Sequence, residues 1–402
     1  MKWSPLIEDS DLRNSILQTI DIISESLYAI SPDGIGLLVG AAGISFFWEY
    51  LYLHDSNIKY RYYSNGLINS SLDCITTTPM SYNLSGGISG VLWAYRHLMK
   101  TGAIKSDGDI IGNDVRKFLM ESAKVDLIQN NYDYLHGGLS PLPFFLEDIE
   151  NEQSKAFIQE MIVLLENIAE RDFDKIAWFE GSYFIEKNIK RYNLGLSHGM
   201  PSIIILLSKA LENNIDSITV ENLMSGCINW ILNKFDKKST TSYFPTFYPS
   251  NPPYYSRVSW CYGDLGIVLS LFEASLVTNN ISWREEAIKI AINVSQRKIK
   301  DSGIQDACLC HGTAGNAHIF NRLYNYTGKY EFKEAAIYWY METIQFYRVN
   351  KHFKITRRDE NGGNERLEDS FGLLEGIAGI GLSLIASISE IEPKWDRVLL
   401  LS

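Results

Sequence analysis

A short glycine-containing unit recurs along the whole chain. Each copy reads Gly-x-x-Gly or Gly-x-x-Ser and precedes an apolar stretch, with 47 to 64 residues between successive first glycines. Regular recurrence of this kind is typical of repeat architectures, in which each copy forms one supersecondary unit that packs against its neighbours. The first glycines of the copies are Gly40, Gly87, Gly137, Gly199, Gly263, Gly312 and Gly376.

The stretches that follow these glycines predict buried helices. Residues 203–207 and 267–272, for example, are apolar on nearly all sides, as in a helix that is covered all round. The segments between them are amphipathic, and residues 12–30 place apolar side chains at helical spacing. This alternation predicts an all-α fold, an α/α toroid of seven inner and about seven outer helices. The outer segment at residues 58–80 is polar and β-branched, and we expect it to be partly irregular.

Length and composition favour one large domain. We expect residues 1–402 to form it, because the repeat extends from residue 34 to residue 386 and 46% of the residues are hydrophobic. The net charge of −11 disfavours nucleic acid or an anionic membrane as the main partner. No signal peptide is evident, and the longest apolar run, at residues 35–48, is too short to span a membrane. Five cysteines without framework spacing indicate a cytoplasmic protein.

Two thiols and one imidazole form the candidate metal site. Cys310 and His311 directly precede Gly312, and Cys261 lies two residues before the glycine of the preceding repeat, so the three occupy matched positions. Zn²⁺ favours this ligand set, and three protein ligands leave a fourth position open for water or substrate. The sequence therefore predicts one catalytic zinc ion per chain. Cys308 is interpreted as a small apolar filler rather than as a ligand.

The strings that carry these residues resemble a known family. Residues 260–263, 310–315 and 196–199 read Trp-Cys-Tyr-Gly, Cys-His-Gly-Thr-Ala-Gly and Leu-Ser-His-Gly, and they are similar to signature strings of the LanC family, the lanthionine synthetase cyclases. The resemblance covers essentially the whole chain. It implies an α/α toroid that binds zinc and forms thioether rings. In that reaction a peptide cysteine thiolate adds to a dehydroalanine or dehydrobutyrine of the same peptide.

The resemblance also implies roles for individual side chains. His198 stands at the family's histidine and would transfer the proton that the addition requires. Asp133 would orient His198, and Arg257 would stabilise the developing enolate oxygen. Tyr262 would lie beside the metal. The alternatives are a capping or core role for His198 and a plain ion pair between Asp133 and Arg257.

Two departures from the family pattern bear on substrate handling. His136 stands where the family's type member carries a glutamate. A short aromatic insertion at residues 236–257 replaces a larger accessory lobe, and its tyrosines and prolines predict a stiff wall for a peptide substrate. The alternative is that these aromatic rings only seal the shortened insertion.

The expected partner is a dehydrated precursor peptide. The sequence leaves open whether a lanthipeptide dehydratase and an exporter also bind, and whether the chain associates peripherally with a membrane-bound biosynthetic complex. Three other interpretations were weighed. They are a relative that adds glutathione to dehydroamino acids in proteins, a different toroid enzyme such as a prenyltransferase or a glycosidase, and a non-catalytic scaffold with a four-ligand structural zinc.

Overall fold

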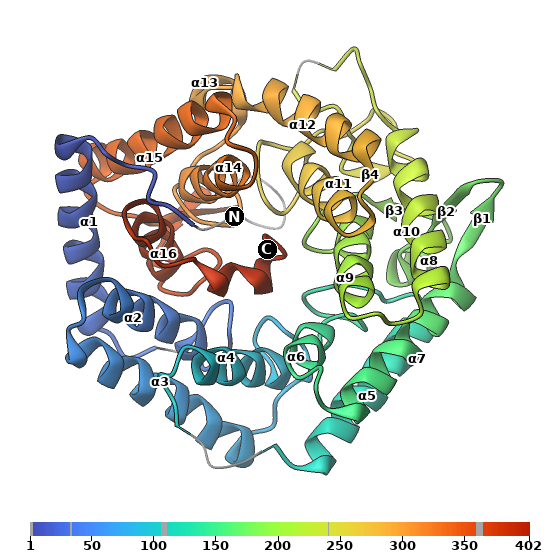
Figure 1. Ribbon diagram of the computed structural model, residues 1–402, viewed down its shortest axis with the longest axis horizontal. Coiled ribbons are helices and arrows are strands. Elements are labelled where there is room, and N and C mark those ends of the chain that lie inside the picture. Colours follow the sequence, from blue (N-terminus) through green and yellow to red (C-terminus); the bar gives the residue numbers. More distant parts are fainter. Residues whose placement is uncertain (1–2, 33, 106–110, 240, 359–364) are drawn as a thin grey trace. The chain divides into compact units, whose positions relative to one another are not determined.

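The computed structural model describes residues 3–32, 34–105, 111–239, 241–358 and 365–402, and they are mainly helical (Figure 1). The chain divides into two compact units. The first unit comprises Met1–Ser81, Ser85–Lys105 and Ser295–Leu401, and the second comprises Tyr82–Leu84, Ser106–Val294 and Ser402. No described helix combines the length and the apolar character that are needed to cross a membrane.

In the first unit, long helices pack in pairs. Helix α2 packs on α3, α14 packs on α15, and α16 lies against α1, α2 and α14. Strands β5 and β6 form an antiparallel hairpin between α15 and α16. The bounds are α1 (Ser10–Tyr28), α2 (Ala41–Asp55), α3 (Ile58–Thr77), α4 (Ile88–Lys100), α13 (Ile299–Ser302), α14 (Thr313–Thr327), α15 (Tyr330–Asn350), β5 (Ile355–Arg358), β6 (Glu365–Glu368), α16 (Ile377–Ile388) and the 3-10 helix η1 (Lys394–Leu399).

In the second unit, α9 packs between α10 and α11, and α7 packs on α5 and α6. Two short antiparallel pairs, β1 with β2 and β3 with β4, lie in the connections between helices. The bounds are α5 (Asn113–Ile128), α6 (Leu142–Glu147), α7 (Glu152–Ile168), β1 (Glu170–Asp172), β2 (Lys175–Ala177), α8 (Gly181–Lys187), β3 (Tyr192–Asn193), α9 (Met200–Glu212), α10 (Ser217–Leu232), β4 (Phe247–Tyr248), α11 (Asp264–Thr278) and α12 (Ile281–Ser295), whose last residue belongs to the first unit.

The repeat glycines begin the buried helices. In six repeats the first glycine is the N-cap residue, and the helix starts directly after it. The third repeat differs, because α6 starts at Leu142, five residues after Gly137, and is short. The helices that follow the glycines are covered nearly all round, as the sequence predicts; every residue of α16 is buried. Helix α1, by contrast, buries one stripe that includes Ile16, Ile20 and Ile23.

The expectation of an irregular segment at residues 58–80 is wrong. Helix α3 runs without interruption from Ile58 to Thr77, and the Asn57 side chain caps it by accepting a hydrogen bond from the Lys59 amide at 3.2 Å. Its buried residues are Ser64, Ile68 and Ser71. Helix α3 packs on α2 and α4, so tertiary packing stabilises a helix whose apolar pattern is weak.

Five of the seven repeats present the glycine at the end of a loop closed by the same hydrogen bond. The amide that follows the glycine donates to the carbonyl six residues before the glycine, for example Thr313 to Asp306 at 3.2 Å and Gly138 to Asn131 at 2.8 Å. The loops of neighbouring repeats are also bonded to one another. In the first unit the Cys310 amide donates to the Leu374 carbonyl at 3.0 Å. The residues directly before the glycines are therefore held next to those of an adjacent repeat.

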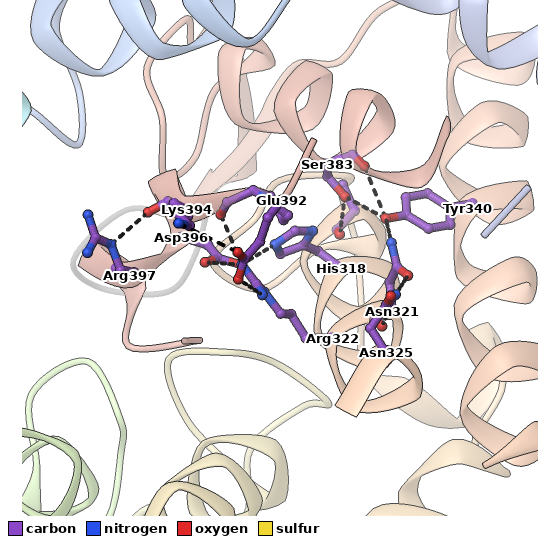
Figure 2. Close-up of polar contacts among 12 residues, drawn as sticks. His318, Asn321, Arg322, Asn325, Tyr340, Ser383, Glu392, Lys394, Asp396 and Arg397 are labelled. Atoms are coloured by element: carbon purple, nitrogen blue, oxygen red, sulfur yellow. Dashed lines mark hydrogen bonds and ion pairs between the residues drawn. The ribbon is translucent and has the colours of Figure 1, made fainter. Parts of the chain in front are cut away.

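A buried ionic cluster attaches the C-terminal helix η1 to α14 in the first unit (Figure 2). Asp396 accepts hydrogen bonds from Arg322 Nε at 2.7 Å and from Arg322 Nη2 at 2.9 Å, and it lies 2.7 Å from His318 Nε2. Burial alone would raise the pKa of Asp396, but the charges and hydrogen bonds of Arg322 and His318 together outweigh it and lower this pKa to about 2. The cluster thus links η1 to α14, the helix that follows the candidate metal ligands, and loss of either charge would leave the other buried and uncompensated.

Candidate functional site

The loop before α14 holds the first part of the site. Cys310 is buried, and the side chain of His311 is 14% exposed. The loop is tight because its chain folds back on Gly312, where a Cβ atom would lie only 2.2 Å from the Cys308 nitrogen. Only glycine fits such a close approach of the chain. The donor atoms of Cys310 and His311 lie within 4.8 Å of each other.

Two carboxylates flank the ring of His311. Nε2 lies 3.2 Å from Asp306 Oδ2, and Nδ1 lies 4.0 Å from Glu375 Oε1. Burial alone would raise the pKa of Asp306, but the hydrogen bond and charge of His311 outweigh it, and the pKa of Asp306 is lowered. Arg357, on β5, donates a hydrogen bond to Glu375 at 2.6 Å.

The sequence predicts Cys261, Cys310 and His311 as one ligand set, and in the described part of the first unit the side chains of Asp306, Cys308 and His311 lie close enough together to form another. The first set has the two thiols and one imidazole that Zn²⁺ favours. In the second set, the Asp306 carboxylate already bonds the His311 ring and accepts the Cys308 amide at 3.2 Å. The chemistry of the first set therefore fits zinc better. The interpretation of Cys308 as a filler overlooked its place beside Asp306 and His311.

The second unit holds an aspartate–histidine pair. His198 Nδ1 lies 2.7 Å from Asp133 Oδ2. The other oxygen, Oδ1, accepts the amides of Leu135 at 2.7 Å and His136 at 2.9 Å, which fixes the orientation of the carboxylate. Burial alone would lower the pKa of His198, but the hydrogen bond and charge of Asp133 outweigh it and raise the pKa of His198 above its ordinary value. The predicted contact between Asp133 and His198 is present.

Cys261 lies next to this pair. Both the amide and the hydroxyl of Ser197 donate to the Cys261 carbonyl at 3.3 Å. The charge of Cys261 is one of the causes that raise the pKa of His198. One unit thus brings a candidate metal ligand and a candidate proton-transfer group together from adjacent repeats.

Aromatic rings surround His198. The ring of His136 stacks on it with centroids 5.9 Å apart and an interplanar angle of 17°, and the Tyr262 ring lies 6.1 Å away. The Tyr262 hydroxyl lies 3.5 Å from Asn193 Nδ2, and burial raises the pKa of Tyr262 to about 12. Tyr262 therefore stays protonated at neutral pH and can donate a hydrogen bond.

The aromatic insertion reaches the same surroundings through one residue. Phe247, on β4, has its ring 5.7 Å from that of Tyr262, and β4 pairs with β3 just before the His198 loop. Tyr255 donates a hydrogen bond to Asp236 at 2.6 Å, whereas Tyr254 is 65% exposed. Residue 240 of the insertion lies outside the described residues. A substrate wall at residues 243–255 stays a prediction.

Arg257 lies in the chain that leads into the Trp-Cys-Tyr-Gly string, and its carbonyl lies near Gly263, where φ is +97°. Among the described residues, Asp133 bonds His198 and the backbone amides of Leu135 and His136. The role of Arg257 toward an enolate stays a prediction.

A sequence model of the family described as "Lanthionine synthetase C-like protein" matches residues 31–400. The chain belongs to this family. The "Nisin biosynthesis protein NisC" of Lactococcus lactis subsp. lactis is 25% identical over 347 residues, which are 79% of this chain and 77% of that protein. The "Glutathione S-transferase LANCL1" of Danio rerio is 36% identical over 70 residues, 17% of this chain and 16% of that protein.

The solved structure of nisin cyclase superposes with a TM-score of 0.71 at 18% identity and covers 98% of each chain. This likeness shows the fold, and it confirms the predicted α/α toroid class.

Three polar residues of this family member were missed from the sequence: Asp306, Glu375 and Asn193. A signal for Glu375 was present, because it stands directly before a repeat glycine, as do His198 and His311. Asp306 and Asn193 each stand six residues before a repeat glycine. Sequence position alone does not tell a loop-closing side chain from one that contacts a site.

Proposed function

We propose that this family member is a zinc-dependent lanthipeptide cyclase, which forms lanthionine or methyllanthionine rings in a dehydrated precursor peptide. The observation that carries the proposal is the place of Cys261 beside the Asp133–His198 pair within one unit: Ser197, the residue before His198, donates a hydrogen bond to the Cys261 carbonyl. A thiol that is a candidate metal ligand, beside a partly buried histidine held by a carboxylate, suits a reaction that needs both an activated thiolate and a proton donor.

Cys261, Cys310 and His311 would hold one zinc ion per chain. When bound, zinc lowers the pKa of a coordinated substrate thiol, so that the thiol reacts as a thiolate near neutral pH. The donor set supports this assignment, since it is one that zinc favours and it leaves a position open for substrate.

His198 would supply the proton that completes the addition. The sulfur electron pair forms the bond to the β-carbon, and the π electrons of the dehydroamino acid move to the α-carbon and its carbonyl oxygen. The resulting enolate must gain a proton at the α-carbon. Asp133 orients His198 and raises its pKa, which increases the protonated fraction near neutral pH. Arg257 and Tyr262 are proposed to stabilise charge on the carbonyl oxygen.

The peptide substrate is inferred from the relatives that match over most of the chain, one of which is named for nisin biosynthesis. A dehydratase and an exporter are proposed as further partners on the same ground. A second candidate is the addition of glutathione to dehydroamino acids. The 70-residue match to a relative named as a glutathione S-transferase favours it, and both reactions need the same thiol chemistry.

The test uses a peptide with one dehydroalanine and one cysteine. Ring formation leaves the mass unchanged but removes the free thiol, so the product escapes alkylation and is recognised by mass spectrometry. The wild-type protein is expected to protect the thiol. His198→Ala is expected to keep zinc and to slow the reaction by about 10² to 10⁴, the usual range for a general acid–base group.

His136→Ala is the matched control, since this histidine also precedes a repeat glycine and stacks on His198 without bonding Asp133 through its ring. A smaller loss is expected from it. A cysteine-free peptide incubated with glutathione tests the second candidate, whose product would be heavier by one glutathione. Failure of the wild-type protein to protect the thiol would reject the cyclase.

A further inference from the structure

The loop before α14 carries a buried charge that its fold does not require. Asp306 stands six residues before its repeat glycine, and its Oδ1 accepts the Cys308 amide at 3.2 Å. In the repeat of Gly199, the neutral Asn193 makes the same contact, with Oδ1 accepting the Gly195 amide at 2.9 Å. An amide side chain therefore suffices to close this loop.

Charge at this position is confined to two repeats. The residues six positions before the repeat glycines are Gly34, Ser81, Asn131, Asn193, Arg257, Asp306 and Ser370. The two charged ones, Arg257 and Asp306, belong to the two repeats that carry Cys261 and Cys310. The Asp306 side chain is only 2% exposed, and burying an unpaired carboxylate charge costs free energy. The partner of this carboxylate is His311, at 3.2 Å. The negative charge of Asp306 therefore interacts with the His311 ring, whereas closing the loop does not require it.

We propose that Asp306 is a positioning residue, which fixes the tautomer of His311 so that Nδ1 is the nitrogen that binds the metal. This inference rests on the proposed zinc site. An ionised carboxylate can only accept a hydrogen bond, so Nε2 must carry the proton. A neutral imidazole has one N–H, and the lone pair is then on Nδ1. Metal-binding histidines usually have their other nitrogen held in this way, which orients the ring.

The substitution Asp306→Asn makes a sharp test because its geometry can be foreseen. Oδ1 stays with the Cys308 amide, as in the Asn193 loop, and the new amide nitrogen then faces His311 Nε2. An amide nitrogen can only donate a hydrogen bond, so Nε2 must accept it with a lone pair. The neutral ring then carries its proton on Nδ1. The variant should keep the conformation of the loop, but its His311 should have no lone pair on Nδ1 with which to bind the metal.

Zinc affinity would be measured by competition with a chromophoric chelator, and the His311 tautomer of the metal-free protein by imidazole nitrogen NMR. Asp306→Asn is expected to weaken zinc binding about 10-fold to 100-fold, the usual effect of losing such a partner, with an unchanged melting temperature of the metal-free protein. Its His311 should carry the proton on Nδ1, whereas the wild-type ring carries it on Nε2. Asp306→Ala, which removes the bond without inverting it, should bind zinc at least as well as Asp306→Asn.

Two controls separate this role from others. Glu375→Gln removes the other carboxylate beside His311, and an equal loss of affinity there would show a general charge effect and overturn the proposal. Cys308→Ala should keep zinc, and loss of zinc would make Asp306 and Cys308 ligands instead. Wild-type protein without zinc would reject the metal site and this inference with it. Zinc in the wild type with equal affinity in Asp306→Asn would reject the role of Asp306 alone.

Discussion

Asp133 Oδ2 and His198 Nδ1 are 2.7 Å apart, although the two residues are 65 positions apart in the chain. The second carboxylate oxygen is held by two backbone amides, so the aspartate cannot turn away from the imidazole. The ring is therefore oriented with Nε2 directed away from Asp133, which leaves that nitrogen available for the proposed proton transfer.

Asp133→Asn is expected to shift the pH dependence of cyclisation. Asp133 raises the pKa of His198, so removing the charge lowers that pKa. A histidine that acts as an acid must be protonated, and activity falls as pH rises through its pKa. The alkaline limb of kcat/KM should thus move to lower pH in the variant. An unmoved limb, measured on protein with full zinc content, would exclude His198 as the proton donor.

Cys310→Ala is expected to lose most of its zinc and to stay folded. Cys310 is a ligand in the proposed set, whereas the buried helices are held by an extensive apolar core. Elemental analysis would report the metal, and far-ultraviolet circular dichroism would report the helices. Cys74→Ser is the control, because this thiol is partly exposed on α3 and belongs to neither candidate metal set. Full zinc in Cys310→Ala would remove Cys310 from the ligand set.

Tyr254→Ala is expected to raise the KM for a dehydrated peptide about tenfold with kcat nearly unchanged, because an exposed ring offers contact area that a bound peptide would cover. Tyr255→Phe is the companion variant. It removes the hydroxyl that bonds Asp236 and should lower the melting temperature without changing KM. If Tyr254→Ala leaves KM unchanged, the aromatic residues of the insertion have only a packing role and do not contact the substrate.

Stability is expected to fall on mild acidification because two fully buried histidines resist protonation. Burial lowers the pKa of His97 to about 3, and burial also lowers the pKa of His318 in spite of its bond to Asp396. The unfolded chain, with an ordinary histidine pKa of about 6.5, binds protons that the native state does not. The free energy of unfolding should therefore decrease as pH falls below about 6.5, by up to ~1.4 kcal/mol per pH unit for each histidine.

Denaturation by urea at several pH values between neutrality and about pH 5 measures this slope. His97→Gln gives the control, since it should show a shallower dependence. Stability that stays constant or rises over this range would contradict the prediction. Asp396 contributes in a different window: its pKa is about 2, so its contribution is lost only in strong acid.

The local sequence pattern predicted much of the fold. A buried helix is apolar on all sides, and glycine is an accepted N-cap residue, so both features can be recognised from neighbouring positions in the sequence. The glycine of each repeat could therefore be placed at a helix N-terminus, and six of the helices begin there. Helix α3 was misjudged because two of its three buried residues, Ser64 and Ser71, are small and polar, and such side chains leave no apolar stripe.

The sequence indicated part of the candidate site, and the tertiary structure revealed the rest. Repeat position and donor chemistry, both present in the sequence, singled out Cys261, Cys310 and His311. The tertiary structure alone revealed that Asp306 bonds the ring of His311 and that Glu375 lies on the ring's other side. The physical reason is that the residue type alone determines the chemistry of a side chain. Its hydrogen-bond partner, by contrast, depends on how residues distant in the sequence come together in the fold.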